Sequence, residues 1–406
     1  MSQFKPVEEQ LAIILRGATQ IETRDELKKK LERSHATGKP LRIKYGIDPT
    51  GFDVHLGHTV PLRKLRQFQE LGHTAVLIMG TATAAVGDPS GRDASRQGLT
   101  PEQIEKNACT YLEQIGKVID LATPGRFEIR PNGDWFSKFG FPQMLRLLGQ
   151  MTVQQMLERD DFTKRIKSGT AIYLHEMLYP LMQGWDSVEI QSDVELGGTE
   201  QLYNLMVGRD LQRGAGQEAQ ICFTMPILRG LDGEKKMGKS LGNYIGLNEP
   251  PKEMFGKTMS ITDNLMPEWY TLLTDRSNDD INNLVGHPLE AKKTLAAEIV
   301  RFYHGDEVAA TTRKDWDLSS KGNDPINIDE VTIPASKLKD GQMLAVELIA
   351  EAKLTTSKGE ARRKIEEGAF NYGPDRTKAA DVKATVAVTD GLVIRLGRKI
   401  LRIRLG

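Results

Sequence analysis

The chain has 406 residues, of which 39% are hydrophobic and 27% charged, and its 55 basic side chains balance 55 acidic ones. This length and composition indicate a folded protein of two or three domains and exclude a largely disordered chain. Because it has only Cys109 and Cys222 and no apolar run long enough for a membrane helix, the sequence excludes a disulfide framework, a cysteine-based metal site and membrane insertion, and we expect a cytoplasmic protein.

The first part of the sequence predicts alternating helices and strands. In chain order we expect helices within 8–36, a strand over 41–47, a helix over 56–71 and a buried strand over 74–80. This order is a βαβ unit, which is typical of an open parallel sheet. Ligands of such sheets bind beyond the carboxyl ends of the strands, so the loops at 48–51 and 87–91 are the expected ligand site.

The later sequence predicts more helix and a separate tail. The expected elements are helices over 101–122 and much of 139–182, a strand over 187–196, amphipathic helices over 249–316, a linker over 317–341, and then two helices and short strands that include 392–396 and 399–405. The last 73 residues, from Pro334, contain 15 Lys and Arg but 9 Asp and Glu. A net charge of +6 there fits a polyanion partner, and it also fits chance and solubility.

His55, Gly57 and His58 stand at the start of the predicted crossover helix. Two imidazoles near a helix N-terminus could donate hydrogen bonds to phosphate oxygens, and a glycine between them lets a flat base or ribose approach. Taken alone, a zinc pair or two incidental histidines explain this spacing at least as well. The position after a strand-to-helix turn favours the phosphate interpretation.

A second candidate is the Gly- and Lys-rich loop at 233–246, which contains Lys236 and Lys239. Its lysines could neutralise a polyphosphate, while its glycines let the loop move. A solvated charged loop is the simpler interpretation of this stretch alone. The spacing excludes a P-loop.

A third candidate is the set Tyr179, Gln183 and Asp186, which share one helical face because they are four and three residues apart. A phenol, an amide and a carboxylate on one stripe would form a polar wall. A partly exposed stripe of an ordinary helix is the alternative.

Six motifs in one order resemble the class I tyrosyl-tRNA synthetases of bacterial type. They are DPTG at 48–51, HLGH at 55–58, GDPSG at 87–91, YPLMQGWD at 179–186, GGTEQ at 197–201 and KMGKS at 236–240. In the tail, TSKGEARRKI at 356–365 resembles the small RNA-binding domain that these enzymes share with a ribosomal protein.

The resemblance implies an α/β fold with a Rossmann-like parallel-sheet catalytic domain, a helical domain and a small α+β RNA-binding domain. The implied ranges are 1–232 for the catalytic domain with its N-terminal helices, 233–325 for the lysine loop and helical domain, 326–342 for a linker and 343–406 for the RNA-binding domain. Since such enzymes are homodimers, the resemblance also implies a homodimer.

The implied reaction joins tyrosine to ATP, releases pyrophosphate and transfers the tyrosyl group to the terminal ribose of tRNA(Tyr). The carboxylate of tyrosine is already a nucleophile, so catalysis would be positioning and stabilisation of phosphate charge, with Mg²⁺ accompanying ATP and no protein metal site. The implied catalytic residues are Thr50, His55, His58, Lys236 and Lys239. The implied ATP and adenylate contacts are Gly46, Asp48, Gly57, Gly198, Glu200 and Lys239.

The implied amino-acid contacts are Asp88, Tyr179, Gln183, Asp186 and Gln201, among which Asp186 would accept the phenol O–H of tyrosine. The implied RNA contacts are Lys358, Arg362 and Arg363. The sequence departs from the pattern of relatives at Lys44, where some of them have tyrosine, and from the commoner residues at Thr81-Ala82 (Asp-Phe), Trp185 (tyrosine), Glu200 (aspartate) and Gly238 (serine).

Three rival functions share the scaffold. A tryptophan–tRNA ligase has the same fold, and Asp186 and the DPT sequence at 48–50 favour tyrosine over it. A diverged paralogue that activates another amino acid is disfavoured by the complete RNA-binding tail. A non-catalytic RNA-binding protein would be expected to lose the two histidines or the loop lysines, which are present.

Overall fold

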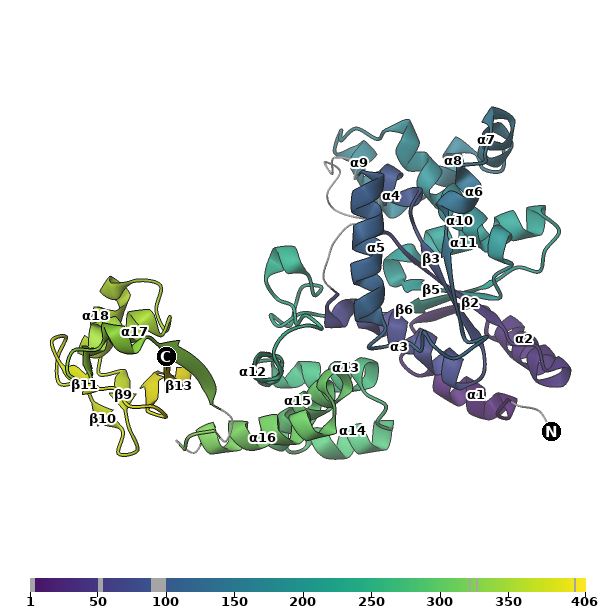
Figure 1. The fold of residues 1–406 in the computed structure, drawn as a ribbon. Helices are drawn as coiled ribbons and strands as arrows, with labels where there is room; N and C mark the ends of the chain where they lie inside the picture. Colours follow the sequence, from purple (N-terminus) through teal and green to yellow (C-terminus); the bar gives the residue numbers. More distant parts are fainter. Residues whose placement is uncertain (1–3, 50–53, 89–99, 321–322, 326–327, 398) are drawn as a thin grey trace. The chain divides into compact units, whose positions relative to one another are not determined.

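The computed structural model describes residues 4–49, 54–88, 100–320, 323–325, 328–397 and 399–406. Thr50 and the end of the GDPSG sequence therefore lie outside the described residues. The chain divides into two compact units, Met1–Asp306 and Glu307–Gly406 (Figure 1). The finer predicted division of the first unit at residue 232 stays a prediction. Within the described ranges, no helix has the length and apolar character needed to span a membrane.

The first unit is built on a six-stranded sheet in the order β1-β6-β5-β2-β3-β4. Its strands are β1 (Gln20–Glu22), β2 (Arg42–Ile47), β3 (Thr74–Met79), β4 (Phe127–Pro131), β5 (Val194–Gly198) and β6 (Ile221–Met225). All neighbours are parallel except β1, which is antiparallel to β6. Every residue of β3 is buried, as expected for a central parallel strand. The predicted Rossmann-like sheet is confirmed.

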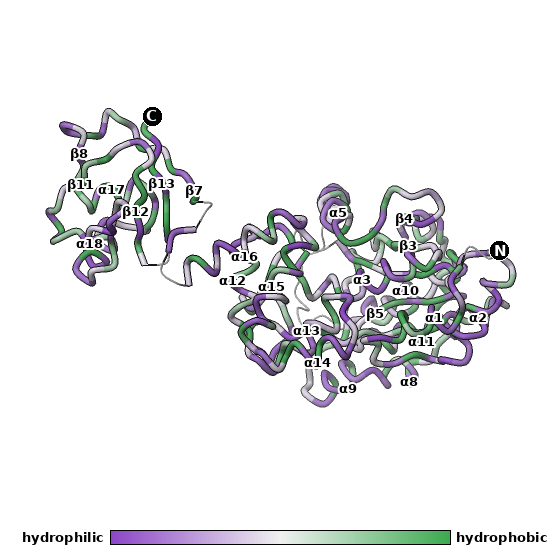
Figure 2. The backbone as a smooth tube through the Cα atoms, turned by 90° about the horizontal axis from the view of Figure 1, so that it is seen from below, coloured by the Kyte–Doolittle hydropathy of each residue, from purple (hydrophilic) through white to green (hydrophobic). Residues whose placement is uncertain are grey.

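Helices surround this sheet (Figure 1). They are α1 (Val7–Leu15), α2 (Arg24–Thr37), α3 (Leu56–Glu70), α4 (Thr83–Val86), α5 (Pro101–Ile115), α6 (Gly133–Phe136), α7 (Phe141–Leu148), α8 (Val153–Met156), α9 (Asp160–Lys167), α10 (Leu178–Ile190) and α11 (Leu202–Gly214). The chain is mainly hydrophilic along α2 and mainly hydrophobic through β3 (Figure 2). This contrast separates a surface helix from the core.

The predicted strand over 187–196 is wrong. Helix α10 continues to Ile190, the chain turns at Gln191 with a φ of 51°, and β5 begins only at Val194. Ser187 and Val188 are both buried in the helix, so the apparent alternation was the inner face of a helix end. Short apolar runs do not distinguish the two structures.

Four helices follow the sheet in the first unit: α12 (Pro251–Met259), α13 (Met266–Leu273), α14 (Asn278–Val285) and α15 (Pro288–His304). They confirm the predicted helices over 249–316 together with α16 (Asp306–Ser320), nearly all of which belongs to the second unit. Trp269 and Tyr270 of α13 are fully buried, and the Tyr270 hydroxyl donates to the carbonyl of Ala291 in α15 at 2.7 Å.

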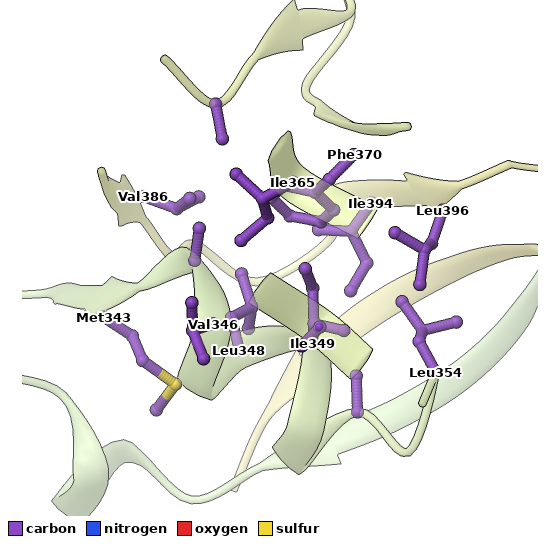
Figure 3. Packing of buried hydrophobic residues seen from close by; sticks show 14 of the residues in the cluster. Met343, Val346, Leu348, Ile349, Leu354, Ile365, Phe370, Val386, Ile394 and Leu396 are labelled. Atoms are coloured by element: carbon purple, nitrogen blue, oxygen red, sulfur yellow. The ribbon is translucent and has the colours of Figure 1, made fainter. Parts of the chain in front are cut away.

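The second unit contains a five-stranded sheet in the order β10-β9-β12-β13-β7 and a two-stranded sheet of β11 and β8. Its elements after α16 are β7 (Asp329–Ile333), β8 (Gln342–Leu344), α17 (Ala345–Glu351), α18 (Lys358–Glu366), β9 (Phe370–Tyr372), β10 (Thr377–Lys378), β11 (Thr385–Ala387), β12 (Val393–Leu396) and β13 (Lys399–Leu405). Ile349, Phe370 and Ile394 pack in its core (Figure 3). Strand β7 falls in the range expected to be a linker and pairs in parallel with β13.

Candidate active site

Two stacked imidazoles cap the N-terminus of α3. His55 is the N-cap residue, and its Nδ1 atom accepts a hydrogen bond from the backbone N–H of Gly57 at 3.2 Å. The Nδ1 atom of His58 accepts from the backbone N–H of His55 at 3.2 Å, and the ring centroids are 3.7 Å apart. Because each Nδ1 atom accepts, each neutral ring carries its hydrogen on Nε2, where it can donate to an anion.

The lysine loop lies beside these imidazoles. The end of the loop pairs with the histidine turn, because the backbone N–H of Leu56 donates to the carbonyl of Ile245 at 3.0 Å and His55 forms a bridge with Gly246. Burial lowers the pKa of His55 to about 2 and that of His58 to about 4. The charges of Lys236 and Lys239 contribute to both of these shifts, so both rings remain neutral at physiological pH.

Asn243 holds the lysine loop in shape. Its Nδ2 atom donates to Asp232 Oδ2 at 2.6 Å and to the carbonyl of Lys236 at 3.2 Å, while its Oδ1 atom accepts from the backbone N–H of Gly238 at 2.9 Å. A Cβ atom on Gly230 would lie 2.3 Å from the same Nδ2 atom, so only glycine fits opposite this amide. The buried Asn243 therefore joins the two ends of the loop around its exposed lysines.

Asp48 lies just after β2 and is enclosed by hydroxyl donors. Tyr179 donates to its Oδ2 atom at 2.8 Å, and Thr83 donates to its Oδ1 atom at 2.7 Å. Burial raises the pKa of Asp48 to about 6, against the opposing effect of these two hydrogen bonds. A Cβ atom on Gly80 would lie 1.9 Å from Asp48 Oδ1, so the carboxylate depends on glycine there.

Asp186 is buried on α10 with two donors from the segment after β4. Trp135 Nε1 donates to its Oδ1 atom at 3.0 Å and Asn132 Nδ2 to its Oδ2 atom at 3.4 Å. The same Asn132 group donates to the Thr83 hydroxyl at 3.0 Å, which connects Asp186 to Asp48 through hydrogen bonds. Burial raises the pKa of Asp186 to about 7, and these donors act in the opposite direction.

Three amides form the wall next to these carboxyl groups. Asn204 Nδ2 donates to Gln183 Oε1 at 2.9 Å and to Gln201 Oε1 at 3.1 Å. Gln201 Nε2 in turn donates to Asp88 Oδ2 at 2.8 Å. The predicted residues Gln183, Gln201 and Asp88 are therefore linked in one network, and Asn204 is a member that the sequence did not reveal.

The predicted glycines differ in how much space surrounds them. A Cβ atom on Gly57 would meet the His55 ring at 3.0 Å, and one on Gly198 would lie 2.3 Å from the Glu200 carboxylate. Glu200 therefore folds back over its own loop. Gly46 is exposed, with no atom within 4 Å of a Cβ position, so packing alone does not require a glycine there.

Two of the departures have partners other than Asp186. Trp185 Nε1 donates to Glu189 at 2.8 Å, and its ring lies edge-on to Phe139 at 5.7 Å. The Thr81 hydroxyl accepts from the backbone N–H of Gly133 at 2.9 Å. The predicted RNA contacts Lys358, Arg362 and Arg363 are exposed on α18 and belong to the other unit.

The sequence-based reasoning missed the residues that hold the predicted ones: Thr83, Asn132, Trp135, Glu195, Asn204 and Asn243. The one available signal was a charged residue within a strand that should be buried, which applies to Glu195. The carboxyl ends of β2, β3 and β5 and the loop after β6 thus carry neutral imidazole donors and lysines, which can bind anions, and carboxyl and amide groups, which can bind an ammonium group or a hydroxyl group.

The comparisons with known proteins agree with this arrangement. The family described as tRNA synthetases class I (W and Y) matches residues 36–317. A tyrosine–tRNA ligase of Symbiobacterium thermophilum is 47% identical over 404 residues, which covers 98% of this chain and 97% of the relative. A tyrosine–tRNA ligase of Oleidesulfovibrio alaskensis is 46% identical, with coverage of 97% and 98%.

Solved structures show the same fold at lower identity. A C-terminally truncated mitochondrial tyrosyl-tRNA synthetase of Coccidioides posadasii has a TM-score of 0.62 at 21% identity, covering 77% of this chain and 92% of that one. The tyrosyl-tRNA synthetase of Archaeoglobus fulgidus, complexed with L-tyrosine, has a TM-score of 0.60 at 23% identity, covering 76% and 100%. On its fold, its site and its near full-length relatives, the chain belongs to the class I tRNA synthetases of the tryptophan and tyrosine family.

Proposed function

We propose that this chain is a tyrosine–tRNA ligase, which activates tyrosine with ATP and then transfers the tyrosyl group to the terminal ribose of tRNA(Tyr). The observation that carries the proposal is the buried carboxyl group of Asp186 in the same site as the His55–His58 cap. The relatives at 44–47% identity, all named tyrosine–tRNA ligases, support it.

At the phosphate end, the chain stabilises charge rather than moving protons. The tyrosine carboxylate attacks the α-phosphate of ATP, and negative charge increases on the departing pyrophosphate. The Nε2–H groups of His55 and His58 donate to this group at the N-terminus of α3, and Lys236 and Lys239 close over it. Thr50 joins them in the proposal, and Mg²⁺ accompanies ATP as part of the substrate.

At the amino-acid end, the chain selects the side chain. Asp88, Tyr179 and Gln183 hold the ammonium group, Gln201 lines the pocket beside them, and Asp186 accepts the phenol O–H. Phenylalanine would occupy the same space without a donor and would leave a buried carboxylate short of a partner, which is unfavourable. Asp48, Gly46, Gly57, Gly198 and Glu200 line the ribose and adenine.

The second unit and the surface of the first unit provide the proposed contacts with tRNA and with a second copy of the chain. Exposed Lys358, Arg362 and Arg363 on α18 contact the phosphates of tRNA. A second copy of the chain covers α7, where Phe141 is 76% and Leu145 51% exposed, because large apolar side chains in one patch mark an interface. The cytoplasm, where tRNA is charged, is the proposed location.

Amino-acid-dependent pyrophosphate exchange tests this function. Exchange with tyrosine, and little with tryptophan or phenylalanine, is the expected result. Tryptophan-dependent exchange would identify the tryptophan enzyme instead, and exchange with neither would remove the proposal.

A further inference from the structure

A fully buried ion pair lies beneath the amino-acid pocket. Lys44 of β2 and Glu195 of β5 are neighbours in the parallel sheet, with 0% and 1% of their side chains exposed, and the Lys44 Nζ atom is 3.0 Å from Glu195 Oε1. Removing two charges from water is expensive, and a pair of apolar residues is often as stable in such a place. Stability alone therefore gives little reason for charges at these two positions.

The other hydrogen bonds of the pair reach α10 and the segment just before β6. Besides Glu195, Lys44 Nζ donates to the carbonyl of Gln183 at 2.6 Å and to the Ser187 hydroxyl at 2.8 Å. Glu195 Oε2 accepts from Ser187 at 3.1 Å and from Gln220 Nε2 at 2.5 Å. The pair thus fixes the stretch of α10 between Gln183 and Asp186.

The Oε1 atom of Glu195, which also pairs with Lys44, determines which way the Gln183 amide points. Gln183 Nε2 donates to Glu195 Oε1 at 3.0 Å, so its own Oε1 atom lies on the opposite side, where Asn204 donates to it. A carboxylate only accepts, whereas an amide turned the other way would need a donor at this place. The amide oxygen is consequently the atom presented to the ammonium group of the substrate.

We propose that Lys44 and Glu195 are positioning residues of the amino-acid pocket, which fix the orientation of the Gln183 amide and set the charge beside the buried Asp186. This inference rests on the proposed function and adds to it a means of setting the affinity of the pocket for tyrosine. It also gives a role to Lys44, the residue that stands where some related enzymes have tyrosine.

The electrostatics of Asp186 agree with this geometry. Burial raises its pKa to about 7, the charge of Lys44 lowers it, and the charge of Glu195 raises it. The other groups that face Asp186 are Tyr179 on its own helix and the donors Asn132 and Trp135. Lys44 and Glu195 therefore act on Asp186 in opposite directions.

The test is a double variant of the full-length chain, Lys44→Met with Glu195→Met, assayed by tyrosine-dependent pyrophosphate exchange and by thermal unfolding. Since an apolar pair can replace a buried ion pair without loss of stability, we expect an unchanged or higher Tm. We expect KM for tyrosine to rise about tenfold, because the Gln183 amide loses its acceptor, while KM for ATP stays the same. A matched control is Arg209→Met with Glu26→Met, an ion pair between α11 and α2, which should leave both KM values unchanged.

A single variant, Glu195→Gln, supplies a second measurement if the double variant does not fold. Removing the negative charge lowers the pKa of Asp186, so the acid limb of kcat/KM for tyrosine should move to lower pH by about half a unit or more. An unmoved limb, or a double variant with the constants of the unaltered chain, would overturn the inference alone. No tyrosine exchange in the unaltered chain would overturn the proposed function and this inference with it.

Discussion

The two ends of the site are built in opposite ways. At the proposed phosphate end, the lysines are exposed on a loop, and the buried Asn243 amide helps to hold that loop. At the proposed amino-acid end, Asp186 is buried and Asp48 partly buried, and each accepts two side-chain hydrogen bonds. A loop that must admit and release a triphosphate needs freedom, whereas a pocket that distinguishes a single hydroxyl group needs fixed donors and acceptors.

Burial also has opposite effects at the two ends. It lowers the pKa of His55 and His58, which favours neutral donors, and it raises the pKa of Asp48 and Asp186, which brings carboxyl groups toward neutrality. In both places burial thus disfavours the charged form of the titratable group that it encloses. The incoming phosphates and ammonium group then meet dipoles that are already oriented.

The largest effect is expected at the phosphate end. Lys239→Ala should lower kcat for adenylate formation by about 100- to 1,000-fold, because a charge that stabilises the transition state is lost. Tyrosine affinity should be kept, as equilibrium binding would show. Lys235→Ala, on the same loop, is the matched control and should stay close to the unaltered rate. A collapse of tyrosine affinity in the Lys239 variant would show that the two ends are not separate.

A somewhat smaller effect is expected at the amino-acid end. Asp186→Asn should reduce kcat/KM for tyrosine by about 50-fold, because a charge-assisted hydrogen bond to the phenol becomes a weaker one. Exchange with phenylalanine, which makes no such bond, should change little and serves as the internal control. Equal losses for both amino acids would mean that Asp186 only supports the fold.

Substitution of Asn243 tests whether the order of the lysine loop affects the binding of ATP. Asn243→Ala removes three hydrogen bonds that hold the loop, so we expect KM for ATP to rise about tenfold with tyrosine KM unchanged. Exposed Asn282 on α14 offers the control, Asn282→Ala. Unchanged ATP kinetics would show that the loop orders itself without this amide.

The smallest effect on exchange is expected from the second unit. The combined substitution of Lys358, Arg362 and Arg363 by alanine should leave exchange intact and reduce the slope of tRNA affinity against salt by about 2. A filter-binding series over salt concentration measures it. An unchanged slope would place the RNA contacts elsewhere.

The fold was predictable where the periodicity was long. Strand β2, helix α3 and strand β3 follow the expected ranges closely, because each is an uninterrupted apolar pattern that ends in glycine or proline. The strand expected at 187–196 failed because ten residues of mixed polarity fit a helix end as well as a strand. Strands β1, β4 and β6 are only three to five residues long and gave no signal.

In the candidate site, likewise, residues close together in the sequence could be predicted, whereas residues that only the fold brings together could not. His55 and His58 could be recognised because a cap and its helix are adjacent in sequence. Glu195 and Lys44 could not be paired, because 151 positions separate them and only the β2–β5 register brings them together. Asn132 and Trp135 reach Asp186 from the segment after β4, a strand that the sequence did not reveal.

The Thr83 hydroxyl links the two halves of the pocket through one hydrogen atom. It donates that atom to Asp48 and accepts from Asn132, which also reaches Asp186. A hydroxyl has a single hydrogen to give, so the relay has one direction for as long as Asp48 is ionised. If a nucleotide binds beside Asp48 as proposed, the Thr83 hydroxyl and the Asn132 amide would transmit its effect to the carboxyl group of Asp186.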